Sequence, residues 1–159
     1  MKSRLQRALL LLVVVATVGC DQVTKRVASS NLIGEGRQSF LGDTVRLEYA
    51  ENPGAFLSLG MGLPPSVRSA VFTYGTGLVL VLVAIAALRR SWSSSALLGL
   101  SLIWSGGVSN LVDRASSGHV VDFLNVGVGQ WRTGIFNVAD VAIMAGVSLV
   151  VMTRRNEAS

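Results

Sequence analysis

Four long apolar stretches constrain the fold of this chain more than any other feature of its sequence. They cover residues 5–24, 70–88, 93–112 and 135–153. Each is about as long as the roughly 18 residues that a helix needs to cross a bilayer. Half of the 159 residues are hydrophobic and only 14% are charged, which excludes an ordinary soluble domain. The sequence predicts an all-α membrane protein with four transmembrane helices in a single domain, residues 1–159.

The distribution of lysine and arginine predicts how these helices are oriented. Seven of the 14 basic residues crowd into three short flanks, and the other seven are spread over two long segments, residues 25–69 and 113–134. Dense basic flanks are typical of the cytoplasmic side of a membrane. Both termini and the turn after the second span are therefore predicted to be cytoplasmic, with the long segments outside. The crowded residues are Lys2, Arg4, Arg7, Arg89, Arg90, Arg154 and Arg155. This bias accounts for the pI near 10.4, so we infer no nucleic-acid partner.

The first outer segment contains a pattern typical of a strand. Residues 44–49 alternate apolar Val45, Leu47 and Tyr49 with charged side chains, as half-buried strands do. We expect this strand to pair with residues 38–41 in a small amphipathic β-sheet on the outer membrane surface, between the first two helices. Residues 52–60 follow as a turn-rich stretch, because Pro53 and Gly54 oppose regular structure.

Two aspartates lie where a membrane chain should least favour charge. Asp122 comes just ahead of the fourth apolar stretch, and Asp140 lies inside its start. Ionisable groups at membrane depth are costly and tend to mark function, and two nearby carboxyls suffice for acid and base hydrolysis without a metal. Asn137 and Asp140 also fit the start of a helix, in a capping-box-like relation. A cap would explain Asn137 completely, but it would not explain Asp122.

Other polar residues are predicted to converge on the same outer end. Asp21 and Lys25 are four residues apart and can pair on one helical face, and Asn110 and Arg114 have the same spacing. Asp113 is expected to mark the exit of the third span from the membrane. Trp92 and Trp131 are interpreted as interfacial anchors and His119 as a solvated loop residue. The sequence has no Cys and His cluster with metal-ligand spacing, no GxSxG elbow and no glycine-rich phosphate loop.

Two other classes of protein remain open on these patterns. Residues 1–20 imitate a lipoprotein signal peptide that ends at Cys20, although Thr17 stands where such a signal prefers leucine. The chain could then be a structural lipoprotein, with Cys20 modified rather than a packing residue. A small proton-coupled carrier or channel could also use intramembrane aspartates. A carrier would need a polar track through the midplane, whereas the second span is apolar throughout.

Five blocks, taken in order, resemble the lipoprotein signal peptidase family, also called signal peptidase II. They are DQVTK at residues 21–25, NPGAF at 52–56, GGVSNLVDR at 106–114, GHVVDF at 118–123 and FNVAD at 136–140. The resemblance implies an aspartyl peptidase of the bacterial cytoplasmic membrane with four transmembrane helices. Such an enzyme removes signal peptides from prolipoproteins by cutting before a diacylglyceryl-modified cysteine, with its active site on the outer side.

The same resemblance implies the roles of individual residues. Asp122 and Asp140 fall on the catalytic dyad, and no cofactor or metal is required. Substrate-binding or site-supporting positions are implied for Asp21, Lys25, Asn52, Gly54, Asn110, Arg114 and Asn137. The expected partners are lipidated prolipoproteins and membrane lipid, and the expected state is a monomer. Two departures concern the substrate loop: Ser109 stands where the family commonly has glycine, and Phe56 follows Ala55 directly.

Overall fold

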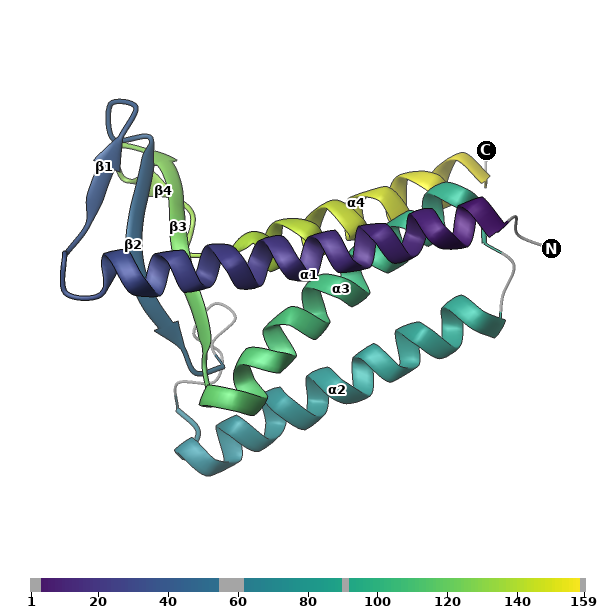
Figure 1. Ribbon diagram of the computed structural model, residues 1–159, viewed down its shortest axis with the longest axis horizontal. Coiled ribbons are helices and arrows are strands. Elements are labelled where there is room, and N and C mark those ends of the chain that lie inside the picture. The colour runs from purple at the N-terminus through teal and green to yellow at the C-terminus, as the bar shows by residue number, and fades with distance from the viewer. Residues whose placement is uncertain (1–3, 55–61, 90–91, 158–159) are drawn as a thin grey trace.

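The protein places a small antiparallel sheet at one end of a set of long helices (Figure 1). The computed structural model describes residues 4–54, 62–89 and 92–157. Lys2, Arg90 and residues 55–60 of the predicted turn, including Ala55 and Phe56, lie outside these ranges. The elements are, in order, α1 (Arg4–Leu32), β1 (Gln38–Phe40), β2 (Val45–Asn52), α2 (Pro65–Arg89), α3 (Ser94–Ser117), β3 (Val120–Val128), β4 (Trp131–Arg132) and α4 (Val138–Glu157).

Three of these helices, α1, α2 and α3, are long and apolar enough to cross a membrane. Large hydrophobic side chains such as Leu12, Leu82 and Val151 are exposed on the outer faces of the helices. An exposed apolar surface of this extent is unfavourable in water and suits a membrane-embedded protein. The fourth helix, α4, is 20 residues long and carries Asp140, Arg154 and Arg155.

The helix boundaries differ from those predicted, for local reasons. Helix α1 continues to Leu32, eight residues past the predicted span, because its last turns pack against the sheet. Helix α3 continues to Ser117 and ends where Gly118 adopts a left-handed conformation, with φ of 80°. Helix α4 begins three residues later than the predicted span, at Val138, because Asn137 caps it.

The sheet has the strand order β1-β2-β3-β4, and all neighbours are antiparallel. The predicted pairing of β1 with β2 is confirmed, with Gln38 opposite Leu47 and Phe40 opposite Val45. The predicted location of the whole sheet between the first two helices is wrong, because β3 and β4 come from the second outer segment. An irregularity in β2 between Leu47 and Ala50 shifts the register, so that Ala50 lies opposite Asp122.

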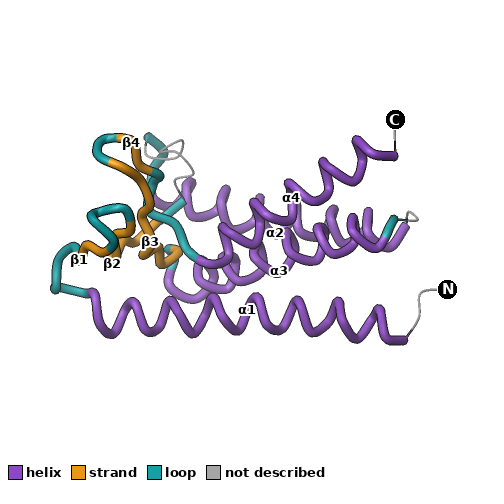
Figure 2. The backbone as a smooth tube through the Cα atoms, turned by 90° about the horizontal axis from the view of Figure 1, so that it is seen from above, coloured by secondary structure: helices purple, strands orange, loops and turns teal. Residues whose placement is uncertain are grey.

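An apolar core joins the sheet to the end of α1. Ala28, Leu32 and Phe123 are buried there, and Leu47 and Val138 pack against them. Figure 2 shows the consequence, with the strands gathered at one end of the helices and α1 running along beneath them. This packing places the first half of β3 over the end of the helices, close to the first turn of α4.

Candidate active site

Asp140 is held in the first turn of α4 by a reciprocal cap. The Asp140 backbone N–H donates to Asn137 Oδ1 at 3.0 Å, and the Asn137 backbone N–H donates to Asp140 Oδ2 at 3.2 Å. This is the capping-box relation predicted from the sequence. The cap fixes the carboxylate at the positive end of the α4 dipole.

Asn137 does more than cap this helix, so the prediction that a cap would explain it completely is wrong. Its Nδ2 donates to Asp122 Oδ1 at 2.6 Å and to Asn110 Oδ1 at 3.2 Å. The side chain is fully buried. One amide therefore contacts Asp140 through its oxygen and Asp122 through its nitrogen, and it joins the two aspartates into one polar group.

Asp122 lies near the start of β3, with only 3% of its surface exposed. Its Oδ2 accepts a hydrogen bond of 3.0 Å from Asn52 Nδ2, at the end of β2. Burial raises the pKa of Asp122 to about 6, and repulsion by Asp140 adds to the effect, whereas hydrogen bonds from Asn52 and Asn137 oppose it. The group can therefore exchange a proton near neutral pH.

Gly54 keeps the end of β2 close to α2. Its φ is 120°, and a Cβ at this position would lie 2.5 Å from the Phe72 ring. Its backbone N–H donates to Asn52 Oδ1 at 3.1 Å, which leaves the Asn52 amide nitrogen directed at Asp122. Gly54 thus supports the orientation of Asn52.

Beneath the two aspartates lies a buried ion cluster centred on Lys25. The Lys25 ammonium lies 2.6 Å from Asp21 Oδ2 and 2.6 Å from Asp113 Oδ2, and it donates to Asn110 Oδ1 at 2.8 Å. The predicted pairing of Asp21 with Lys25 is confirmed. Asp113, expected only to mark the end of a span, is instead buried and paired with Lys25. Two carboxylates and one ammonium satisfy each other where water is scarce.

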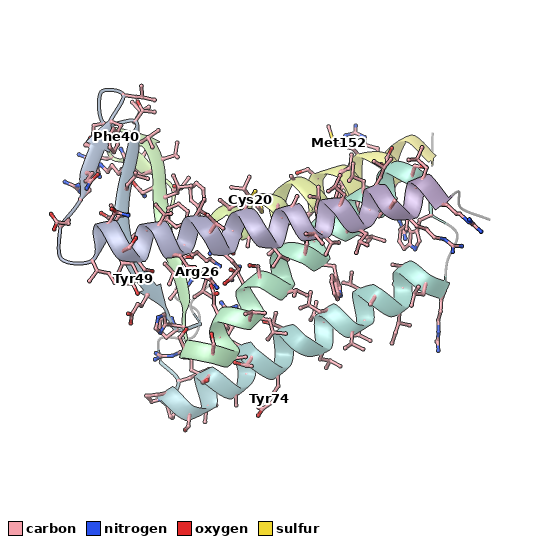
Figure 3. The ribbon with its side chains drawn as sticks, in the orientation of Figure 1. Cys20, Arg26, Phe40, Tyr49, Tyr74 and Met152 are labelled. Carbon is pink, nitrogen blue, oxygen red and sulfur yellow. The ribbon has the colours of Figure 1, made fainter. Side chains whose placement is uncertain are left out.

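Asn110 connects the ion cluster to the aspartate pair. Its Nδ2 donates to Asp140 Oδ1 at 3.0 Å, and its Oδ1 accepts from both Lys25 and Asn137. Figure 3 shows side-chain nitrogen and oxygen atoms gathering where the sheet end of α1 faces α3, near the labelled Arg26. The structure therefore brings Asp21, Lys25, Asn52, Asn110, Asn137 and both aspartates into one hydrogen-bonded network.

Arg114, near the end of α3, is the second cation beside this network. Within the described residues, its Nε is buried and has no hydrogen-bond partner. Its guanidinium interacts electrostatically with Asp140, Asp122 and Asp113. A buried N–H without a partner is costly, so a group that accepts from Arg114 would bind favourably there.

Sequence reasoning missed two further members of the network, Gln22 and Ser109. Gln22 Nε2 donates to Asp113 Oδ1 at 2.7 Å and to Ser109 Oγ at 3.0 Å. The spacing of three between Asn110 and Asp113 was a usable signal for Asp113, but nothing local marks Gln22. His119 lies apart, with its Nε2 3.6 Å from Glu51 Oε1. The described residues contain no group of three or more His, Cys, Asp or Glu side chains suited to hold a metal ion.

Known proteins that are similar to this chain in sequence are described as signal peptidases. The profile of a family described as signal peptidase (SPase) II matches residues 13–154. The lipoprotein signal peptidase of Rhodococcus jostii is 40% identical over 156 residues, covering 92% of this chain and 73% of that protein. That of Desulforapulum autotrophicum is 34% identical over 148 residues, covering 91% of each.

Solved structures match the fold. A bacterial membrane enzyme determined in meso at 2.3 Å resolution has a TM-score of 0.80 at 22% identity, covering 96% of this chain and 90% of that one. Another, at 1.9 Å resolution, has a TM-score of 0.81 at 24% identity and covers 91% of each chain. The profile and the sequence relatives extend over most of the chain, and on this evidence the protein belongs to the signal peptidase II family of peptidases.

Proposed function

We propose that this protein removes signal peptides from prolipoproteins, cutting on the amino side of a diacylglyceryl-modified cysteine, with Asp122 and Asp140 as its catalytic pair. The observation that carries the assignment is the shared contact with Asn137, whose side chain bonds to Asp122 and to Asp140 at once. Asp122 Oδ1 accepts from the Asn137 side chain and Asp140 Oδ2 from the Asn137 backbone N–H. The two carboxyls come from different elements, a sheet strand and a helix, so their common contact with Asn137 is not a by-product of local structure.

The two carboxyls divide the work of amide hydrolysis between them. Asp140, at the N-terminus of α4 and bonded to Asn110 Nδ2, is the carboxylate that takes a proton from the attacking water. Asp122, whose raised pKa lies near 6, holds the proton that polarises the scissile carbonyl and then passes to the leaving amine. The pair titrates as a coupled unit, since each charge disfavours the other.

Arg114 supplies a donor for the tetrahedral intermediate, and Asn52 orients Asp122. The unpartnered Nε of Arg114 can donate to the substrate backbone or to the developing oxyanion. Asn52 already donates to Asp122, so it keeps that carboxyl oriented while the substrate binds. Donors fixed in advance stabilise charge strongly where water is excluded.

The placement of the site suits a lipidated substrate. In the proposed arrangement four helices, including α4, cross the bacterial inner membrane with both termini in the cytoplasm. The sheet and the aspartates then lie at the outer surface, in one domain of residues 1–159 that acts as a monomer. The diacylglyceryl group would stay in the lipid while its peptide bond reaches the carboxyls, so that the lipid anchor helps to position the bond.

The decisive experiment compares a lipidated prolipoprotein with its unlipidated twin, using the purified protein in detergent micelles. The wild-type protein should process only the lipidated form. Asp122→Asn and Asp140→Asn should each lower the rate by about a thousandfold or more, because removing one member of a catalytic unit disables the whole unit. Asp43→Asn, which changes an exposed aspartate at the β1–β2 turn, is the matched control and should leave the rate unchanged.

Substantial cleavage by either dyad variant, with correct insertion, would remove that residue from the mechanism. Equal processing of the two substrates would instead leave a peptidase that does not require the lipid, and the proposed specificity would be wrong.

A further inference from the structure

Ser109 is fully buried on α3, in the position directly before Asn110. Its hydroxyl donates to Asp21 Oδ2 at 2.7 Å and accepts from Gln22 Nε2 at 3.0 Å. A hydroxyl has a single hydrogen, and the Gln22 N–H occupies one of its lone pairs. The Ser109 proton is therefore directed at Asp21 and not toward its own helix.

Asp21 uses its two carboxylate oxygens on different elements. Oδ2 receives Ser109 and lies 2.6 Å from the Lys25 ammonium, whereas Oδ1 accepts from the Ala139 backbone N–H at 2.8 Å. Ala139 lies in the first turn of α4, where backbone N–H groups have no partner within the helix. Asp21 thus caps α4 from α1, across 118 positions of sequence.

We propose that Ser109 is a positioning residue for the catalytic pair and acts through Asp21. The carboxylate torsion of an aspartate is soft, so its rotation is set by the donors around it. The Ser109 hydroxyl fixes that rotation with Oδ1 on the Ala139 N–H, and this contact holds the first turn of α4. Asp140 follows Ala139 directly, so its carboxylate is placed against Asp122 by the same contact. The inference rests on the proposed catalytic roles of Asp122 and Asp140.

The role belongs to the arrangement in this chain. The Gln22 amide nitrogen donates to the Ser109 hydroxyl at 3.0 Å and also to Asp113 Oδ1 at 2.7 Å. Removing the hydroxyl leaves a fully buried Asp21 oxygen with only the Lys25 ammonium to hold it, and the carboxylate can then rotate away from Ala139.

The chain offers a matched control one helical turn earlier. Ser105 is also fully buried on α3, but its hydroxyl donates to the Leu102 carbonyl of its own helix, at 3.2 Å. Ser109→Ala and Ser105→Ala each remove one buried hydroxyl from the same helix. Only the first removes a bond to Asp21.

The test measures kcat and KM for a lipidated prolipoprotein, with the melting temperature of each variant in detergent. Ser109→Ala should lower kcat about tenfold and leave KM within about twofold, because misplacing a reacting group affects the chemical step more than binding. Ser109→Thr keeps the hydroxyl and should recover most of kcat. Ser105→Ala should show the wild-type kcat, even if its melting temperature falls as far as that of Ser109→Ala.

Two results would overturn the inference while leaving the proposed function intact. One is an unchanged kcat for Ser109→Ala. The other is an equal fall in kcat for Ser105→Ala that follows the melting temperature, because a purely structural role would affect both variants alike. Asp140→Asn, measured beside them, separates the two claims: if it still cleaves, the catalytic pair itself is wrong, and the role of Ser109 falls with it.

Discussion

Asn137 shows how a single side chain can serve both structure and chemistry. Its oxygen accepts from the Asp140 backbone, as an N-cap does, and its nitrogen donates to Asp122. An amide has an acceptor and two donors, so it can fill these roles together, which a carboxylate or a hydroxyl could not do in the same way. At this position, the start of a helix and the assembly of the proposed catalytic pair depend on the same residue.

Burial of Asp122 makes the stability of the fold depend on pH. Its pKa rises from 3.8 to about 6 on folding, so the folded state favours the neutral form. The contribution of this preference to the free energy of unfolding is fully present below pH 3.8 and is lost as pH rises through about 6. The loss is roughly 3 kcal/mol, at about 1.36 kcal/mol for each unit of pKa. Asp122→Asn should therefore gain in melting temperature, relative to wild type, as pH increases from 4 to 8.

Asp43 provides the control for that titration, because its shift has the opposite sign. Hydrogen bonds from Arg46 and Ser39 hold the pKa of Asp43 well below its usual range. Its contribution is therefore constant above pH 6 and is lost only in strong acid. The difference in melting temperature between Asp43→Asn and wild type should be flat from pH 6 to 8. For Asp122→Asn the difference should change mainly between pH 4 and 6, and a flat difference over that interval would contradict its raised pKa.

Individual residues could be predicted from the sequence where the evidence is local. The Asp21–Lys25 and Asn137–Asp140 contacts follow from helical spacing, and both are present in the structure. The contact between Ser109 and Gln22 could not be predicted, because it crosses between helices, 87 positions apart in sequence. A short polar residue inside an apolar helix does not show which neighbour it faces, so only the packing of α1 on α3 reveals it.

At the scale of elements, α3 is the support on which the site is assembled. Glycines let α4 approach it closely: a Cβ at Gly106 would lie 2.5 Å from the Ala139 carbonyl oxygen. Backbone atoms cannot yield as the end of a flexible side chain can, so α4 must move if that space is filled. Because Ala139 precedes Asp140, the displacement reaches the carboxylate that we propose to be catalytic.

Gly106→Ala should therefore lower both peptidase activity and melting temperature, with activity reduced about a hundredfold by displacement of the first turn of α4. The measurement is cleavage of a lipidated prolipoprotein by variants that insert normally. Gly75→Ala on α2 is the control, because a Cβ there would meet nothing within 4 Å. That variant should keep its activity. Wild-type activity in Gly106→Ala would show that α4 tolerates the added methyl group.

The elements that the sequence predicted poorly are those covered on both faces. β2 alternates and was recognised, whereas Val120, Val121, Phe123 and Leu124 form a nearly continuous apolar run. β3 lies inside the sheet between β2 and β4, and its Phe123 is buried against α1, so alternation is not required of it. For the same reason the end of α1 was predicted too early, since its final turns are held by the sheet and not by lipid.

On the scale of the whole molecule, the proposed orientation can be tested by chemical labelling. The only cysteine, Cys20, is exposed on α1 and is first removed as Cys20→Ser (Figure 3). Gln38→Cys then marks β1, and Arg155→Cys marks the end of α4. A membrane-impermeant maleimide should label the β1 variant in intact spheroplasts, and the α4 variant only after the membrane is disrupted.

Labelling of the α4 variant in intact spheroplasts would contradict the proposed cytoplasmic C-terminus. Labelling of both variants before disruption would show that α4 does not complete a fourth crossing. Retained cleavage of prolipoprotein by each variant provides the control that the labelled molecules are folded.

Of the two proposed catalytic acids, one belongs to a β-strand and the other to a helix, so the pair keeps its arrangement only while the strand and the helix stay packed together. A compound that bound between the strands and the ends of the helices and separated them would inhibit the enzyme without contacting either carboxyl. Substitutions that confer resistance to such a compound would then lie in the interface between the strands and the helices, away from the two carboxyls.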